Sequence, residues 1–279
     1  VSVRGFNGVL SDKLLVLIDG RSIYSLFYSG VYWDEYDLPL EDVERIEIIR
    51  GPGGTMWGSN AMNGVINVVT RHASETEGTY AVTRVGDGES GAQGRFGKRL
   101  GTNSHGRLWF SASDRGAYAR AAEHYEGGGW RNLGAGTRLD VDDVAGGRLL
   151  LTARAVRVDT EREDLVFDPQ TNTDVIAPPA DHRGIGASTL VRWSRSFGPG
   201  HEFALQGWVE HHDRDERVFS EERTNADVDA QVTLHSDRHV LVAGTNLRAS
   251  RDRLGGSGTY DFVPARRTLR RRQKNCRPH

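Results

Sequence analysis

The stretch that decides the fold is Val43–Thr70, which reads VERIEIIRGPGGTMWGSNAMNGVINVVT. It contains two short strand patterns, Arg45–Arg50 and Gly64–Thr70, separated by a loop rich in glycine. Glycine lets the backbone turn where other side chains would clash. Pro52 lacks an amide donor and ends the first strand. Because Gly64–Thr70 is mostly apolar, we expect its strand to lie in a core.

Two segments upstream extend this pattern. Val3–Phe6 reads VRGF, and Leu14–Arg21 reads LLVLIDGR. In order and spacing, about the first 70 residues resemble the plug domain of TonB-dependent outer-membrane receptors. The resemblance implies a mixed α/β plug domain, followed by the antiparallel strands of a transmembrane β-barrel.

The plug-like segment has recognisable local elements. Leu14–Ile18 is expected to be a buried strand closed by a turn at Asp19–Gly20. Pro39–Glu44 has an early proline and acidic residues, which favour the first turn of a short helix. His72–Gly78 is polar and without periodicity, and we interpret it as the hinge between plug and barrel.

After Gly78 the hydrophobic pattern has a period of two, as in Val228–His235. Such alternation occurs in any half-buried antiparallel sheet, so it indicates a barrel only because a plug-like segment precedes it. About nine strands are expected, too few to close a barrel of the family's size, so we predict an open, curved sheet. Short turns at Gly146–Gly147 and Gly198–Gly200 are assigned to the periplasmic side, and Thr160–Arg183 and Asp213–Asn225 to extracellular loops.

Composition supports strands over membrane helices. Hydrophobic residues make up 37% of the 279, and the mean hydropathy is −0.54. The longest apolar runs are far shorter than the roughly 18–20 residues of a membrane helix. We divide the chain into a plug domain truncated at its amino end (1–72), a partial barrel (73–265) and a basic tail (266–279).

The tail differs from the rest of the chain. Its seven basic and no acidic residues leave a formal charge of −9 for residues 1–265, against −2 overall. A basic tail can bind nucleic acid, but strand alternation stops before it, and we interpret it as non-native sequence. Cys276, the single cysteine, lies within it. We expect the chain to be a fragment that lacks the amino-terminal box that contacts TonB.

Five charged residues are candidates for ionic contacts between plug and barrel. They are Arg4, Glu44, Arg45, Glu47 and Arg50. Charges on a strand most often face solvent. Inside a barrel they would be nearly buried, and because an unpaired buried charge is costly, we expect partners on the barrel wall. Arg50 is the strongest candidate.

Aromatic residues are dense in the segment after the first turn. Tyr24, Phe27, Tyr28, Tyr32 and Trp33 could pack in the plug core, which is the commoner role. If the segment faces outward, the rings would suit an iron chelate or another ring-bearing ligand. A second candidate ligand site consists of Trp57, Ser59 and Asn60.

Other kinds of site find no support. The loop at Gly51–Gly64 lacks the lysine of a phosphate-binding loop and the spacing of a dinucleotide site. His211 and His212 are adjacent in a strand, so they point to opposite faces and cannot readily share a metal ion. No catalytic motif is present, and we expect no catalytic residues, no bound metal and no cofactor.

The resemblance implies a cell outer membrane location and active uptake of a large, scarce solute. The default ligand is a ferric siderophore, and vitamin B12, a saccharide or another metal complex stay open. The implied partners are the TonB–ExbB–ExbD complex and outer-membrane lipid, with no nucleic acid. The alternatives are a soluble or surface-bound carbohydrate-binding or adhesin module, and a hydrolase with a Ser/His/Asp group.

Overall fold

A four-stranded mixed sheet forms the core of the amino-terminal domain, in the order β2-β1-β4-β3. Its strands are β1 (Leu14–Ile18), β2 (Arg21–Ser22), β3 (Val43–Arg50) and β4 (Gly64–Thr70). β1 is apolar throughout because both of its faces are covered. Leu14, Val16 and Ile18 pack on one side and Leu15 and Leu17 on the other. The predicted strands and the positive-φ turn at Asp19–Gly20 are confirmed.

The computed structural model describes residues 14–25, 27, 30–57, 60–116, 118–119, 126–168, 173–217, 219–236 and 238–256. Its short helices are η1 (Trp33–Glu35), η2 (Leu40–Asp42), α1 (Gly54–Trp57) and η3 (Ala73–Thr76). The helix predicted at Pro39–Glu44 is thus a single 3-10 turn. It ends early because Val43 already pairs with Thr70 in the sheet. Among the described residues no helix is long and apolar enough to cross a membrane.

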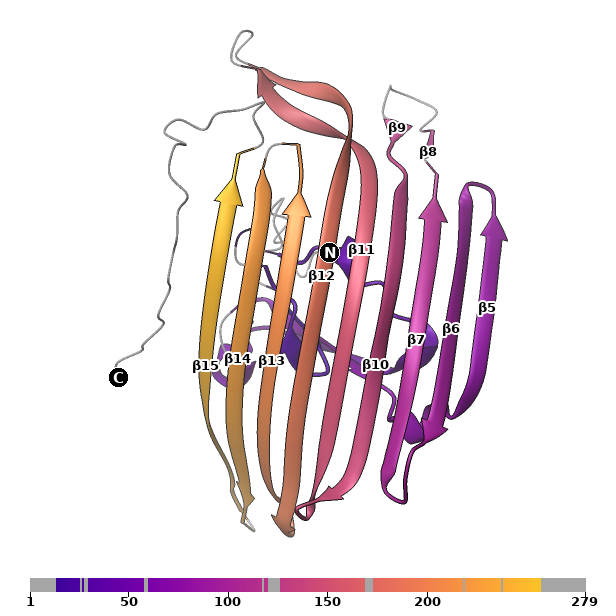
Figure 1. The fold of residues 1–279 in the computed structure, drawn as a ribbon. Coiled ribbons are helices and arrows are strands. Elements are labelled where there is room, and N and C mark those ends of the chain that lie inside the picture. The colour runs from indigo at the N-terminus through magenta and orange to yellow at the C-terminus, as the bar shows by residue number, and fades with distance from the viewer. Residues whose placement is uncertain are drawn as a thin grey trace.

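Nine long strands follow as one antiparallel meander, in the order β15-β14-β13-β12-β11-β10-β7-β6-β5 (Figure 1). They are β5 (Gly78–Gly86), β6 (Glu89–Arg99), β7 (Ser104–Arg115), β10 (Trp130–Val144), β11 (Gly147–Asp168), β12 (Thr173–Gly198), β13 (His201–Asp215), β14 (Ser220–His235) and β15 (Val240–Gly255). Two short strands, β8 (Tyr118–Ala119) and β9 (Glu126–Gly127), form a separate ribbon. The expectation of about nine strands is confirmed.

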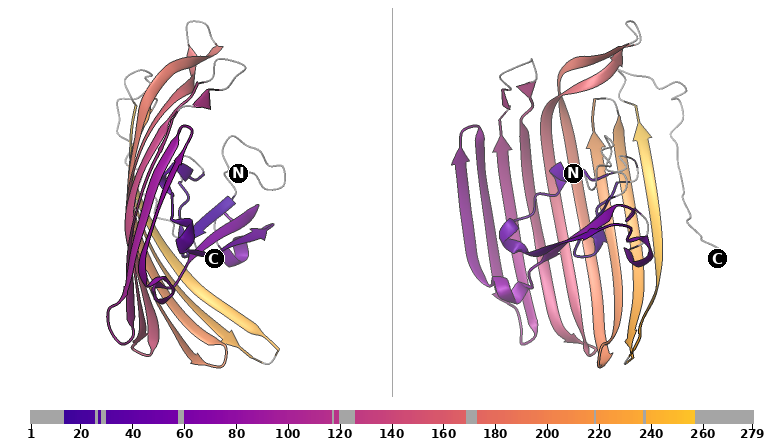
Figure 2. Two further views of the ribbon diagram at one scale, coloured as in Figure 1. Left: turned by 90° about the vertical axis from the view of Figure 1, so that its right-hand side faces the viewer. Right: turned by 180° about the vertical axis from the view of Figure 1, so that it is seen from behind.

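The large sheet is curved and open, and the plug sheet lies on its concave side (Figure 2). Within the described residues β5 and β15 are unpaired edges. This confirms the predicted incomplete barrel wall.

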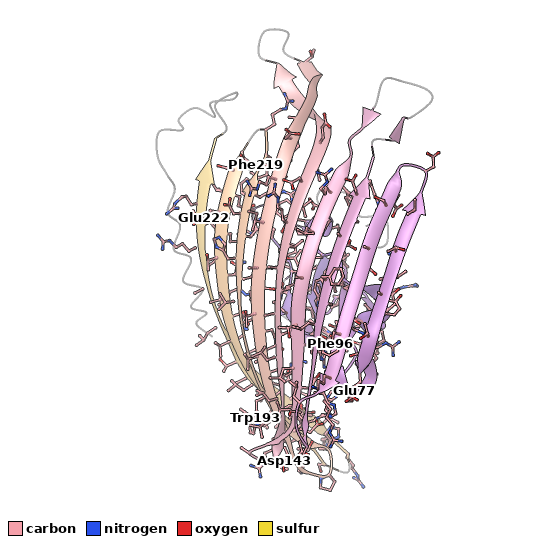
Figure 3. All side chains as sticks on the ribbon, turned by 45° about the vertical axis from the view of Figure 1, so that its right-hand side comes forward. Glu77, Phe96, Asp143, Trp193, Phe219 and Glu222 are labelled. Atoms are coloured by element: carbon pink, nitrogen blue, oxygen red, sulfur yellow. The ribbon has the colours of Figure 1, made fainter. Side chains whose placement is uncertain are left out.

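The two faces of the large sheet differ in chemistry. Charged residues such as Arg107, Arg138 and Arg223 are buried on the concave face, against the plug. Their strand neighbours, such as Leu108, are exposed on the convex face. Residues at both ends of the strands are labelled in Figure 3, with Phe219 and Glu222 near one end and Asp143 and Trp193 near the other. We call these the upper and lower ends.

Two sequence-based loop assignments were wrong. Thr160–Arg183 contains most of a hairpin, because the β11–β12 ladder continues from Arg157 and Ile185 to Asp168 and Thr173, with one irregularity. Asp213–Asn225 is also mostly strand, since β13 runs to Asp215 and β14 begins at Ser220. Proline and acidic residues suggested loops there, but cross-strand backbone hydrogen bonds do not depend on side-chain polarity.

The segment interpreted as a hinge is anchored. Ala73 and Thr76 of η3 are buried, and the Ala73 amide donates to Asp140 Oδ2 of β10 at 2.8 Å. The Arg107 guanidinium also donates to the Arg71 carbonyl at 2.8 Å. The connection between the two sheets is therefore a packed junction.

Candidate functional site: the interface between plug and sheet

The upper part of the interface is centred on Glu35 of η1. Its Oε1 accepts from Arg214 Nη1 at 2.8 Å, and its Oε2 lies 2.8 Å from His212 Nδ1. Asp34 accepts from the same guanidinium at 2.8 Å, and Glu216 is a third acid on it. All five side chains are buried or nearly so, and we call them the Glu35 cluster. Buried charges of this kind are tolerated only when they are paired.

Glycines make room for this cluster on β12. A Cβ on Gly184 would come within 2.8 Å of Glu35 Oε1, and one on Gly186 within 3.6 Å of Oε2. The missing side chains therefore allow η1 to approach the strand backbone. Arg154 of β11 also donates to the Glu35 carbonyl.

Tyr32 links the Glu35 cluster to the next strand. Its hydroxyl donates to Glu221 Oε2 of β14 at 3.1 Å, and its ring stacks on His212 with centroids 5.2 Å apart. The Arg214 guanidinium also lies over this ring, 4.3 Å from its centroid. Burial, together with the Glu221 charge, raises the pKa of the Tyr32 hydroxyl far above its usual range.

A second tyrosine contacts β13 nearby. The Tyr36 hydroxyl donates to Glu210 Oε1 at 2.7 Å, and Arg21 Nη1 lies 2.6 Å from the same oxygen. Burial and the Glu210 charge raise the pKa of Tyr36 strongly. Burial alone would lower the pKa of Arg21, but the carboxylate of Glu210 outweighs it and the pKa is raised. The neutral phenol and the charged guanidinium are thus both favoured at this carboxylate.

The lower part of the interface is centred on Arg138 of β10. Its guanidinium binds Asp140 through two hydrogen bonds of 2.7 and 2.9 Å and donates to Thr70 Oγ1 at 2.7 Å. Thr70 in turn donates to both oxygens of Asp19 at 2.8 Å. The end of β4 and the turn after β1 are therefore held by one side chain of the barrel wall.

Asp42 of η2 provides the remaining lower contact. Its Oδ1 accepts from Arg95 of β6 at 2.5 Å, and its Oδ2 lies 3.4 Å from Arg107 Nε of β7. Arg192 and Gln206 donate to the backbone carbonyls of Asp19 and Gly20 from strands further along the sheet. The plug is therefore held at its base by five strands of the large sheet: β6, β7, β10, β12 and β13.

The charged residues that were expected to contact the barrel lie mostly on β3, where they pair with one another or are exposed. Arg45 pairs with Glu44 and Glu47 on its own strand, at 2.7 Å each. Glu47 also accepts from Asn67, and this bond and Arg45 lower its pKa. β3 is an edge strand of the plug sheet, and Arg50 on it is exposed. Arg4 lies outside the described residues, so contacts of these five residues with the barrel stay a prediction.

The aromatic residues that were expected to bind a ligand differ in exposure. Tyr32 is buried in the interface, whereas Phe27 and Trp33 are 42% and 45% exposed. Phe27 packs against Phe219 at the upper end, with centroids 5.0 Å apart. Tyr24 is half-buried, and its amide donates to Ser22 Oγ. Tyr28 lies outside the described residues.

The second expected ligand cluster is only partly described. Trp57 is half-buried and packs against the plug core cluster that contains Ala61 and Val65. Asn60 adopts a positive φ of 71°, typical of a turn. Ser59 lies outside the described residues, so a ligand role for this group stays a prediction.

His211 and His212 point to opposite faces, as the sequence predicts. His211 is exposed and contacts Thr224 Oγ1 at 3.0 Å, whereas His212 is buried beside Glu35. Among the described residues no three acidic, histidine or cysteine side chains are grouped to hold a metal ion.

Sequence reasoning missed the plug acids that contact the wall: Asp19, Asp34, Glu35 and Asp42. One signal was available. Gly184 and Gly186 occupy alternate positions inside a strand, and glycine in a strand interior often marks a close approach of another backbone. The sequence does not show that η1 is the segment that approaches these glycines, because Glu35 and Arg214 are 179 residues apart.

The geometry defines a class of protein: a small mixed domain lodged by buried ion pairs against the polar concave face of an antiparallel, outwardly apolar wall. The comparisons agree with this. The family model "TonB-dependent Receptor Plug Domain" matches residues 1–65. The vitamin B12 transporter BtuB of Vibrio vulnificus is 42% identical over 79 residues, which are 28% of this chain and 12% of that protein. The ferric enterobactin receptor of Pseudomonas aeruginosa is 33% identical over 91 residues, 29% of this chain and 12% of that one.

Solved structures show the same fold across both parts. The ferric-catecholate import receptor Fiu of E. coli K12 superposes with a TM-score of 0.62 over 91% of this chain and 44% of its own, at 12% identity. The siderophore receptor PirA of Pseudomonas aeruginosa gives 0.61 over the same shares, at 16% identity. The chain thus spans less than half the length of these proteins. Residues 1–65 therefore match the plug domain of TonB-dependent receptors, and the strands that follow have the fold of part of such a receptor's barrel wall.

Proposed function

We propose that this chain is part of an outer-membrane receptor that takes up a large, scarce solute with energy delivered by TonB. The observation that carries the proposal is the plug domain lodged on the concave face by the Glu35 cluster and the Arg138 contacts. A domain held by polar contacts can be displaced without exposing a large apolar core. Displacement of the plug would open a path along the polar concave face.

The proposed ligand is a ferric siderophore, bound at the upper end by Phe27, Trp33 and Phe219. The rings of Phe27 and Trp33 are exposed, Phe219 packs against Phe27, and such rings suit a large chelate with aromatic groups. Tyr24, Tyr28 and Tyr32, with Trp57, Ser59 and Asn60, complete the set proposed from the sequence. The printed names of the relatives support this class of solute, since they include a ferric enterobactin receptor and a siderophore receptor.

Vitamin B12 is the second candidate, because the 42% identical relative is a vitamin B12 transporter. With either ligand, the proposed location of the large sheet is the outer membrane, with lipid against its convex face. The proposed energy source is the TonB–ExbB–ExbD complex. In this proposal the chain has no catalytic role.

The test is a binding titration of the chain in detergent micelles. Quenching of tryptophan fluorescence is followed while a ferric catecholate, a ferric hydroxamate or cyanocobalamin is added. We expect saturable quenching with the catecholate, weakened at least tenfold in Trp33→Ala. If only cyanocobalamin binds, the proposed ligand is vitamin B12 and the siderophore proposal is wrong.

A second measurement separates the receptor from the alternative of a carbohydrate-binding or adhesin module. The receptor wall needs detergent or a bilayer, because its convex face is apolar. A chain that is a stable monomer in plain buffer would contradict the proposed membrane location.

A further inference from the structure

The convex face has a depression over strands β5 to β7. It is a groove of about 250 Å³ lined by Thr79, Ala81, Gly94, Phe96, Leu108 and Phe110. Phe96, Leu108 and Phe110 are each more than half exposed, although they are large and apolar. The strand neighbours Arg95 and Arg107 point the other way and bind Asp42 of the plug. The groove therefore opens on the face away from the plug.

Gly94 accounts for the shape of the groove. The ring of Phe110 occupies the space in which a Cβ on Gly94 would lie. The ring therefore lies flat across β6 and forms one wall, and Ala81 opposite Gly94 in the register adds only a methyl group. The volume exceeds the roughly 150 Å³ of an apolar cavity that accepts benzene. A segment of hydrocarbon chain fits this combination of size and lining.

One positive charge lies on the same face, toward the lower end. Lys98 follows Gly94 by four residues on β6, so the two side-chain positions share a face about 13 Å apart. It is exposed and lies one residue before the strand ends at Arg99. Glu77, which directly precedes β5, is engaged by His105 at 2.8 Å. The Lys98 ammonium is thus available to an external anion.

We propose that the groove and Lys98 form a binding site for one anionic phospholipid, with an acyl chain in the groove and the phosphate at Lys98. The apolar lining excludes a sugar or peptide, since either would bury polar groups without hydrogen bonds. A charge at one end only matches an amphiphile whose head lies at the edge of the bilayer. The inference rests on the proposed membrane location but is independent of solute uptake.

The test is native mass spectrometry of the chain in detergent, titrated with phosphatidylglycerol or with phosphatidylcholine of the same acyl chains. The first phosphatidylglycerol is expected to bind at least tenfold more tightly than the first phosphatidylcholine. Ala81→Trp fills the groove and should weaken the first site about tenfold for both lipids. The matched control is Ala226→Trp, on the convex face of β14, which should leave binding unchanged.

The charge is tested separately. Lys98→Gln should abolish the preference for phosphatidylglycerol while phosphatidylcholine binds as before, and Lys98→Arg should retain the preference. The proposal is overturned if the two lipids bind the unaltered chain equally, or if Ala81→Trp binds like the unaltered chain. Partition into vesicles is measured alongside: failure to partition overturns the membrane location as well, whereas partition without lipid preference overturns this site alone.

Discussion

The carboxylate of Glu35 and the guanidinium of Arg214 lie 2.8 Å apart at the interface between plug and wall, with both side chains about 4% exposed or less. One belongs to a single 3-10 turn of the plug and the other to a long strand of the wall. Each of these two buried charges stabilises the other, because a single unpaired charge away from water would be strongly disfavoured. The seating of the plug should therefore depend more on this pair than on the many exposed ion pairs.

Glu35→Gln is the direct test of that dependence. The substitution leaves Arg214 and His212 without their shared carboxylate, but Arg214 keeps Asp34 and Glu216, so we expect a cost at the low end of the about 3–5 kcal/mol for losing one partner of a buried pair. We expect the plug to be released at lower urea concentration, which limited proteolysis of the detergent-solubilised chain would detect. Glu44→Gln removes an exposed pair with Arg45 and should cost about 0–1 kcal/mol. Equal loss in both variants would show that the Glu35 cluster does not anchor the plug.

Gly184→Ala tests the same contact from the wall. A Cβ there would lie 2.8 Å from Glu35 Oε1, so η1 must shift away from β12. Overpacking of this kind costs about 1–3 kcal/mol. Gly207→Ala is the control, since its nearest neighbour would be 3.7 Å away. Urea unfolding of the two variants should differ, and identical midpoints would mean that η1 has room to move.

Features that depend on neighbouring residues can be predicted from this sequence, whereas features that depend on residues far apart in the chain cannot. β1 and the nine wall strands follow from local periodicity, because alternate side chains face alternate sides of a sheet. The extent of β11 and β12 beyond Thr160 does not, since pairing of their backbones overrides a composition typical of loops. The anchoring acids also lie beyond local reasoning: nothing near Glu35 distinguishes it from Glu44, and only the fold brings Arg214 to it.

Alkaline pH should weaken the interface through Tyr32 and Tyr36. Burial raises the pKa of both hydroxyls in the folded chain, so the folded state retains protons that the unfolded state loses above about pH 10. Stability is therefore fully present below that pH and falls as the pH rises further. Urea unfolding at increasing pH should show this decline.

Tyr36→Phe supplies the control for the alkaline effect. It removes one of the two titrations, so the decline above about pH 10 should become shallower by up to about 1.4 kcal/mol per pH unit. Loss of the hydrogen bond to Glu210 should also cost about 1–2 kcal/mol at neutral pH. If the pH dependence of the variant equals that of the unaltered chain, Tyr36 is not the titrating group.

Placing a charge on each face of β14 tests which face meets lipid. Val228 is 50% exposed on the convex face, and Gln231 lies three residues away on the concave face. An arginine on the lipid side of a barrel costs about 2–4 kcal/mol at the bilayer centre. Val228→Arg should therefore reduce the fraction of chain that inserts into vesicles and resists protease, whereas Gln231→Arg faces the polar side and should insert normally. The reverse order would place lipid on the concave face, where the plug lies, and would be incompatible with a plugged membrane wall.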